Sequence, residues 1–583
     1  MKSFFDSLTG TITAIILINI IGLIIIFSLI PDEKPFKVKP NSILHVNLDK
    51  PIVERKSKNP FQGFDFSDGK GLSLEEILDN IEKAKADTNI KGIYLESGFP
   101  GAGAATLEEI RNALIDFKSE GKFIISYGEI YSQKAYYLAS VADHIFLNPQ
   151  GIIEHKGLSA QLMFFKGLLD KLEIQAQIFR HGKFKSAIEP FMLDKMSQAN
   201  REQVETYIGS IWGHIVKGIS ATRGISVESL NALADNMEIQ DAGACIKYKF
   251  CDDTLYLDQV QDFLKEKSGL KEKDNLRLVP MGKYTKVPKS KKEKTTKDKI
   301  AVVYAVGSIE SGEGDDETIG SDRIAKAIRD ARKDSTIKAI VLRVNSPGGS
   351  ALASDVMWRE VVLARKTKPV IVSMGDVAAS GGYYISCGAD RIFAQPNTIT
   401  GSIGVFGMLP NLEKMFKNKL GITFDTANTN KHSDLGNLSR PVSESEGKVI
   451  QNGVESIYKT FIGRVANGRG MSPDAVDSIG QGRVWSGVDA LKIGLVDELG
   501  GLKDAIKYAA GKVNLENYRL VTLPKQKEPF EEILKELSGE AEARTYQRIQ
   551  KELGLSLDVM QSLSKIMKMK GVQARLPFEI YIN

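Results

Sequence analysis

Cysteine and histidine are both scarce in this chain of 583 residues, and each scarcity makes one class of site less favoured by the sequence. The three cysteines, Cys245, Cys251 and Cys387, lack the spacing of zinc ligands, and their odd, sparse set predicts no disulfide framework. None of the six histidines lies in a recognisable catalytic-triad motif. A histidine distant in sequence could still reach a nucleophile, but no motif marks one.

A strong net charge is also lacking. The chain has 78 basic and 73 acidic side chains, a formal net charge of +5 and 42% hydrophobic residues, which is the composition of an ordinary globular protein. One basic segment, residues 283–299, carries eight lysines, and no second basic patch accompanies it. We therefore expect a solvated linker there rather than a nucleic-acid-binding tail, and we predict no nucleic-acid partner.

Residues 10–30 contain no charged side chain. As a helix with a rise of about 1.5 Å per residue, this run would be about 30 Å long, the thickness of the hydrocarbon core of a bilayer. No small-residue cleavage site follows it, since the next residues are Pro31–Lys34. We predict a retained transmembrane anchor rather than a cleaved signal peptide. Lysines on both sides leave its orientation open.

An internal repeat is the main sign of domain organisation. Ile90–Glu96 matches Ile337–Arg343, and the same offset of 247 residues continues as far as Pro149 and Pro396. So long a period indicates a duplicated domain rather than a solenoid. Within each copy, short apolar runs alternate with amphipathic stretches, which is typical of βαβ units with buried parallel strands. The predicted fold class is α/β, with two tandem domains.

The predicted organisation has five segments. They are an anchor (1–40), a first α/β domain (41–282), a lysine-rich linker (283–299), a second α/β domain (300–524) and a helical C-terminal extension (525–583). The extension has Phe530, Ile533, Leu534 and Leu537 at helical spacing, and we expect a short extended end at Phe578–Ile582. Its helices are expected to pack on a neighbour; a membrane-surface helix is the alternative.

Two glycine-rich motifs in the second copy each follow a predicted strand. Asn345–Ser350 opens a helical pattern, where backbone N–H groups can bind an anion. Gly375–Tyr384 places Ser380 at a strand-to-helix turn, where a hydroxyl can meet a substrate carbonyl. The residues alone leave two interpretations of Ser380 open, a nucleophile and a simple helix cap.

The first copy differs at both motifs. Gln133 stands at the position of Ser380, and Gly98–Gly101 replaces the Ser-Pro-Gly-Gly run. This pattern favours a functional site retained in one copy over two structural caps. A serine also needs a base, and a lysine can serve if it is neutral, at a cost of about 4 kcal/mol for a pKa lowered by about 3. Lys185 lies among apolar and small residues, although most lysines are surface residues.

Five ordered motifs then carry a family resemblance. They are Lys183–Phe191, Asn345–Gly349, Ala378–Tyr384, Thr400–Gly404 and Gly482–Gly487. Together they resemble the signal peptide peptidase A (protease IV) family in its long, duplicated bacterial form, over nearly the whole chain to about residue 520. The resemblance implies two crotonase-like (ClpP-like) domains and a serine protease with a serine–lysine dyad that forms an acyl-enzyme.

The matching motifs also imply roles for individual residues. Ser380 would be the nucleophile, Lys185 the general base and Ser402 the hydroxyl that orients the lysine amine. Backbone amides of Gly348, Gly349 and Gly381 would form the oxyanion hole. Near the position that corresponds to Lys185, the second copy has His432 or Ser433, so neither half would be self-sufficient. We therefore expect Ser380 and Lys185 to meet within hydrogen-bond distance.

The resemblance further implies the setting of the enzyme. Its substrates would be signal-peptide remnants and other hydrophobic peptides, cleaved without a metal or an organic cofactor. The chain would be anchored in lipid by one helix in the bacterial cytoplasmic (inner) membrane, with the catalytic domains on the periplasmic side. It would assemble as a homo-oligomer, a tetramer-like ring with a hydrophobic inner groove. Two alternatives remain at this point: a crotonase-type acyl-CoA enzyme, and a catalytically silent membrane scaffold.

Overall fold

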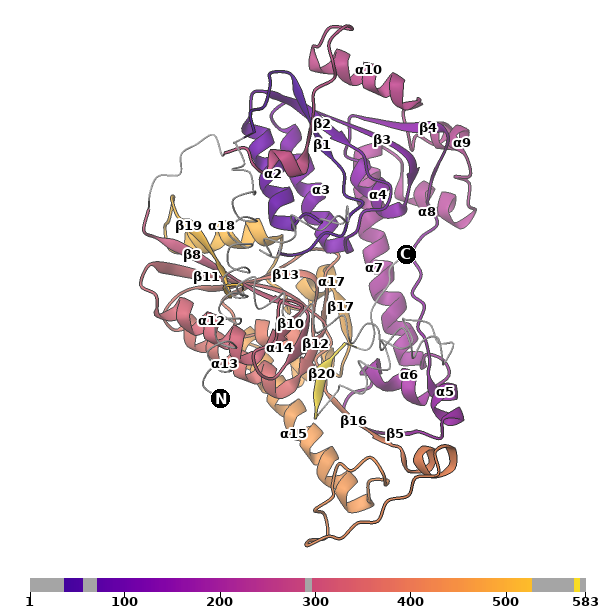
Figure 1. Ribbon diagram of the computed structural model, residues 1–583, viewed down its shortest axis with the longest axis vertical. Coiled ribbons are helices and arrows are strands. Elements are labelled where there is room, and N and C mark those ends of the chain that lie inside the picture. Colours follow the sequence, from indigo (N-terminus) through magenta and orange to yellow (C-terminus); the bar gives the residue numbers. More distant parts are fainter. Residues whose placement is uncertain (1–35, 56–70, 289–295, 527–570, 577–583) are drawn as a thin grey trace, which may run out of the picture.

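The computed structural model describes residues 36–55, 71–288, 296–526 and 571–576 (Figure 1). The predicted anchor at residues 10–30 and the four apolar residues expected on a C-terminal helix lie outside these ranges, as does the extended end expected at Phe578–Ile582. Among the residues that are described, no helix has both the length and the apolar character needed to cross a membrane.

The first half of the chain forms a six-stranded parallel sheet in the order β6-β4-β3-β2-β1-β7. Its strands are β1 (Ser42–Val46), β2 (Ile90–Leu95), β3 (Phe123–Tyr131), β4 (His144–Ile153), β6 (Asp253–Thr254) and β7 (Leu278–Pro280). The associated helices are α2 (Leu74–Ala86), α3 (Ala104–Lys118), α4 (Gln133–Ala139), α8 (Val227–Asp235), α9 (Ala242–Lys247), α10 (Leu257–Ser268) and α11 (Met281–Tyr284). Apolar side chains fill both faces of the sheet, as the uninterrupted apolar runs predict.

The second half forms an eight-stranded sheet with β13 and β11 at its centre, parallel except where β17 meets β15. Its strands are β8 (Lys299–Val306), β11 (Ile337–Ser346), β13 (Val370–Ala379), β14 (Arg391–Ala394), β15 (Ile399–Gly401), β17 (Val484–Ser486), β18 (Glu498–Leu499) and β19 (Arg519–Leu523). The helices of this half are α12 (Ser321–Lys333), α13 (Ala351–Arg365), α14 (Gly381–Ser386), α15 (Glu444–Arg469), α16 (Pro473–Ile479), α17 (Gly487–Lys492) and α18 (Leu502–Lys512).

The helices reproduce the sequence repeat. Leu74 and Ala104, which begin α2 and α3, lie 247 residues before Ser321 and Ala351, which begin α12 and α13. Both pairs of helices also have equal lengths, 13 and 15 residues. The prediction of an α/β protein with two parallel sheets is therefore confirmed.

A third sheet draws strands from both halves, in the order β10-β9-β12-β20-β16-β5. Its strands are β5 (Gln175–Arg180), β9 (Ser308–Glu310), β10 (Thr318–Gly320), β12 (Gly348–Ser350), β16 (Phe406–Asn411) and β20 (Gln573–Arg575). β5 belongs to the first half in sequence, yet it pairs antiparallel with β16 of the second half along its whole length. The two halves therefore share a sheet.

β20 corrects one expectation, because Gln573–Arg575, within the predicted helical extension, form a strand instead. Val572, Ala574 and Leu576 alternate with two polar residues, which is the period of a strand. β20 pairs antiparallel with β12 on one side and with β16 on the other (Figure 1). The end of the chain therefore completes a sheet near the second copy's glycine-rich motifs.

α7 (Gln198–Arg223), a 26-residue helix of the first half in sequence, runs beside both halves (Figure 1). Ser197 caps its start and Gly224, with a φ of 67°, ends it in the left-handed conformation. Near its start, Val204, Tyr207 and Ile211 pack in one cluster with residues of β13, β15 and β17. Just before β5 in sequence comes the short helix α5 (Lys166–Lys171). Between β5 and α7 come the 3-10 turn Ser186–Ile188 and α6 (Glu189–Met192).

Candidate active site

Ser380 lies at the sharp turn between β13 and α14. Its φ of 55° and ψ of −112° are unusual for a residue with a Cβ, and its N–H donates to the carbonyl of Gly401 at 2.8 Å. The side chain caps no backbone N–H of α14, so the helix-cap interpretation of this serine is wrong. The turn instead directs the hydroxyl away from the helix, into the buried space between the two halves.

Lys185 is held in place by main-chain contacts from the second half. The N–H of Phe184 donates to the carbonyl of Gln481 at 2.9 Å. Gly482 has a φ of 85°, and a Cβ there would lie 2.6 Å from the Cα and N of Lys185. The close approach therefore requires glycine, and it presses the lysine segment against the turn at residues 481–482.

The two side chains meet across 195 residues of sequence. Nζ of Lys185 lies 2.9 Å from Oγ of Ser380, 3.1 Å from Oγ of Ser402 and 3.4 Å from the carbonyl oxygen of Ser402. All three residues are completely buried. The prediction that Ser380 and Lys185 approach within hydrogen-bond distance is confirmed, and Ser402 lies where a hydroxyl could orient the amine.

Burial lowers the pKa of Lys185 well below its ordinary value. The partners of Nζ are hydroxyl and carbonyl oxygens of Ser380 and Ser402, which carry no charge to hold an ammonium ion. A neutral amine has two N–H donors and one lone pair. Both oxygens of Ser402 lie within reach of these donors, so the lone pair can accept the hydroxyl proton of Ser380, as a base beside an alcohol does.

Two of the three predicted oxyanion glycines, Gly348 and Gly381, lie beside Ser380. Gly348 has a φ of 94°, and its Cα lies 3.2 Å from where a Cβ of Gly381 would be. The N–H of Gly348 donates to Oγ of Ser346 at 3.1 Å, so this amide already has a partner. Gly381 is the first residue of α14, where an N–H has no partner within the helix. Gly349 lies in β12, which pairs with β9 on one side and with β20 on the other.

The residues that correspond to Ser380 and Lys185 in the other copy make different contacts. Oε1 of Gln133 accepts hydrogen bonds from the N–H groups of Lys156 (2.8 Å) and Gly157 (2.9 Å), so this side chain clamps a loop. His432 lies beside Glu446 at 3.2 Å, and Ser433 is exposed. One divided site, rather than two equivalent ones, is what the geometry supports.

Sequence reasoning missed Gln203, which links the parts that carry the two candidate residues. Its Nε2 donates to the carbonyl of Phe184 at 3.1 Å and to Oγ of Ser186 at 2.9 Å. Its Oε1 accepts from the N–H of Val484 at 3.2 Å. A glutamine on an amphipathic helix gives no local signal of this role, because the contacts depend on how the two halves meet.

Asp376 of the second half caps a helix of the first. Its Oδ1 accepts from the N–H groups of Ala105 and Thr106, both at 2.9 Å, and its Oδ2 accepts from the hydroxyl of Thr106 at 2.6 Å. The N-cap residue of α3 is Gly103, which has no side chain for this purpose, whereas Ser350 caps the matching helix α13. Comparing the two caps in sequence could have revealed the missing partner.

A buried ion network lies next to the Asn345–Ser350 motif. Nε of Arg343 donates to Glu54 at 2.9 Å, and its Nη2 lies 2.8 Å from Glu109, with both carboxylates coming from the first half. Nδ2 of Asn345 donates to Glu54 at 2.9 Å, while its Oδ1 accepts from the N–H of Val377 at 3.1 Å. The network therefore holds the ends of β11 and β13 in register on the side of Ser380.

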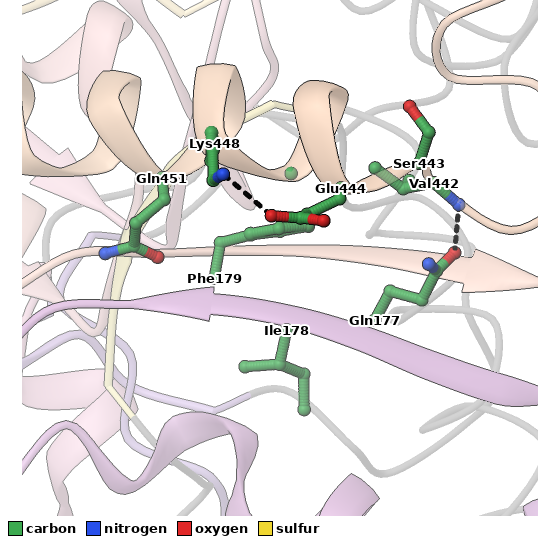
Figure 2. A pocket seen from close by; sticks show the side chains of 9 residues that line it. Gln177, Ile178, Phe179, Val442, Ser443, Glu444, Lys448 and Gln451 are labelled. Carbon is green, nitrogen blue, oxygen red and sulfur yellow. Dashed lines mark hydrogen bonds and ion pairs between the residues drawn. The ribbon is translucent and has the colours of Figure 1, made fainter.

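A pocket outside the candidate site shows how β5 is held (Figure 2). It lies between β5 and the start of α15, where Phe179 points toward the helix and approaches Gly447. Oε1 of Gln177 accepts from the N–H of Val442 at 3.2 Å. Since β5 leads directly to Lys185, these contacts help to position the lysine.

The chain is similar to known proteins over most of its length. The chain matches the model described as Peptidase family S49 over residues 116–271 and 363–516. It is 38% identical to Protease 4 of Salmonella typhi over 489 residues, covering 82% of this chain and 78% of that protein. It is 39% identical to Protease 4 of Haemophilus influenzae over 453 residues, covering 76% of this chain and 73% of that protein.

Two further likenesses are more distant. The chain is 34% identical to the chloroplastic serine protease SPPA of Arabidopsis thaliana over 512 residues, covering 87% of this chain and 74% of that protein. A solved structure of a ClpP1 mutant from Listeria monocytogenes aligns at 16% identity and a TM-score of 0.24, covering 35% of this chain and 94% of that chain. The strand pairings of the sheets, rather than this alignment, establish the fold described above.

Proposed function

This chain belongs to peptidase family S49 and is a serine peptidase of the protease 4 type, and on this premise we propose that it cleaves hydrophobic peptides with Ser380 as nucleophile and Lys185 as general base. The observation that carries the proposal is the buried contact of 2.9 Å between Nζ of Lys185 and Oγ of Ser380. Membership in a serine peptidase family favours neither of the two alternatives raised by the sequence, an acyl-CoA enzyme and a catalytically silent scaffold.

The proposed reaction has two halves. The neutral amine of Lys185 takes the hydroxyl proton of Ser380 as Oγ bonds to the scissile carbonyl carbon, and the carbonyl oxygen becomes an oxyanion. Lys185 then returns the proton to the leaving amine as the C–N bond breaks, which leaves an ester on Ser380. A water molecule, deprotonated by Lys185, attacks this ester and releases the acid, and the proton returns to Ser380.

We propose that the amide of Gly381 is one donor to the oxyanion. It lies at the start of α14, directly after the nucleophile, where the dipole of the turn favours negative charge. The amide of Gly348 would have to exchange its hydrogen bond to Ser346 to become a second donor, and Gly349 would have to use an amide that faces a neighbouring strand.

The surroundings of Ser380 favour an apolar substrate. Ala379, Ile399 and Val484 of the second half form one cluster with α7 of the first half. Such walls offer few polar contacts, which suits a hydrophobic peptide bound mainly by burial. We propose signal-peptide remnants in the cytoplasmic membrane as the natural substrates.

The proposed setting follows from the apolar run at residues 10–30 and from the family. We propose that this run anchors the chain in the inner membrane with the catalytic domains on the periplasmic side, in a ring-like homo-oligomer. If the second half faced the cytoplasm, added protease would digest it in opened cells but not in intact spheroplasts. Digestion in intact spheroplasts is the expected result.

The dyad is tested by cleavage of a synthetic signal peptide with the detergent-solubilised full chain. Ser380→Ala and Lys185→Met should each lose activity by at least about a thousandfold, as removal of a nucleophile or its base does in other serine peptidases. An acylating probe directed at serine should label the wild type and not Ser380→Ala.

Lys183→Met is the matched control, because Lys183 is an exposed lysine two residues away. It should keep near wild-type rates. Retention of activity by Lys185→Met, with Lys183→Met also active, would show that another group is the base.

A further inference from the structure

β20 is an added strand in the sheet that contains Gly348 and Gly349. It lies between β12 and β16 and runs antiparallel to both, pairing Gly348 with Arg575 and Gly349 with Ala574. Its pairing continues past the strand, since Leu576 N–H donates to the carbonyl of Pro347 at 2.7 Å. Addition of a strand to a sheet edge in this way is a common mode of peptide recognition.

The main chain of β20 reaches the oxyanion glycines. The carbonyl oxygen of Ala574 is the atom nearest to where a Cβ of Gly348 would be, and it lies 3.0 Å from where a Cβ of Gly381 would be. Gly381 directly follows Ser380 in sequence. A carbonyl group of the chain's own C-terminal segment therefore lies beside the two glycines that flank the proposed oxyanion position.

The side chains of this segment also fill the site. Ala574 is completely buried in the core of the second half, and Val572 packs against the same core. Leu576 is 5% exposed and packs in the cluster that α7 forms with Ala379 and Val484. The three side chains alternate with Gln573 and Arg575, so one face of the segment points into apolar surroundings.

With β20 in place, Ser380, Lys185 and Ser402 have no exposed surface. A substrate that bound as a strand between β12 and β16 would need their free edges, and both are paired with β20. Two strands cannot occupy one edge, so the segment and a substrate exclude each other.

We propose that residues 571–576 are an internal competitor that occupies the peptide-binding groove and must leave before a substrate peptide binds. This inference rests on the proposed function, because it takes Ser380 as the point of cleavage. It also assigns a specificity: the subsite that holds Ala574 is closed around a small side chain, and the subsite that holds Leu576 accepts a large apolar one.

The test measures binding without catalysis, in the Ser380→Ala chain. The probe is a fluorescein-labelled peptide with the sequence of residues 571–576, and its affinity is measured by fluorescence anisotropy. Three forms are compared: the full chain, a chain that ends at residue 570, and a control chain that ends at Leu576 and so keeps β20. If β20 fills the groove nine-tenths of the time or more, ending the chain at residue 570 should tighten binding by at least about tenfold, while the control should match the full chain.

A point variant of the full chain guards against a folding defect. Ala574→Trp places a large side chain in a closed site, so it should displace β20, tighten probe binding, and raise the rate of peptide cleavage in the chain that retains Ser380. The same replacement within the probe peptide should abolish its binding. A strand that only supported the fold would give the opposite sign, with lower activity and weaker binding.

Equal probe affinity in the full chain and the chain ending at residue 570 would overturn the proposal, as would lower activity of Ala574→Trp. Cleavage within residues 571–576 that depends on Ser380 would also overturn it, because the segment would then be a substrate. The binding results stand even if the dyad assignment fails, since that failure appears separately as full activity in Ser380→Ala.

Discussion

Replacing Ser402 by alanine should slow peptide cleavage by a moderate factor. The change removes the hydroxyl 3.1 Å from Nζ of Lys185 and leaves the carbonyl oxygen of the same residue at 3.4 Å. Net loss of one such hydrogen bond is worth about 0.5–1.5 kcal/mol. At 1.36 kcal/mol for each factor of ten, kcat/KM should fall by roughly twofold to twelvefold, far less than in Lys185→Met.

The assay is steady-state cleavage of a signal peptide over a range of pH. An oxygen that accepts a hydrogen bond from Nζ favours the charged amine over the neutral one, so its removal should lower the pKa of Lys185 further. The rising limb of the pH–rate profile should therefore move to lower pH in Ser402→Ala. A purely structural defect would reduce the rate without moving the limb.

Ser402→Gly separates orientation of the amine from backbone strain. Ser402 has a φ of 50°, which glycine adopts more readily than alanine does. Both variants lack the hydroxyl, so both should show the same loss of rate and the same shift in pH profile. Wild-type kinetics in Ser402→Gly would refute the positioning role, since strain relief would then account for the whole effect.

Three other predictions concern buried charges. Activity should rise with pH and reach its plateau well below 10.5, because burial lowers the pKa of Lys185; a plateau delayed to the pH of an ordinary lysine would exclude this base. Lys185→Met should stabilise the chain against urea at neutral pH, because the unfolded lysine binds a proton that the buried amine releases, and the gain should shrink as pH approaches 10.5; a gain independent of pH would contradict this reasoning. Arg343→Met should lower the free energy of unfolding by about 3–5 kcal/mol by leaving Glu54 and Glu109 buried without a cation, whereas Arg329→Met, at a partly exposed ion pair, should cost about 1 kcal/mol or less; equal losses would be inconsistent with a buried network.

The two-part architecture could be predicted from sequence because duplication preserves spacing. The offset that aligns Ile90 with Ile337 also aligns the starts of α2 and α12. Strand and helix periodicities are local properties, so they remain readable in each copy. The proposed roles of Ser380 and Lys185 needed more than local pattern: a difference between the copies, and then a family resemblance.

What escaped prediction depends on contacts between distant segments. The exchange of β5 into a sheet of the other half is decided by the free edge of β16, which no property of Gln175–Arg180 reveals. Asp376 caps α3 from the opposite half, so its partner lies 270 residues away. β20 is only three residues long, and its position depends on the edges of β12 and β16.

The division of the dyad between the copies has a consequence for synthesis of the chain. A ribosome that has added Lys185 must add 195 more residues before Ser380 exists. Residues 481–483 are added later still, and their carbonyl groups accept the N–H groups of Phe184 and Ser402. In the proposed mechanism, the growing chain therefore lacks an assembled base and nucleophile while its first copy is folding, and cleavage begins only when the second copy is nearly complete. Under the proposed dyad, the order of the two copies alone would delay peptidase activity until synthesis of the chain is nearly finished.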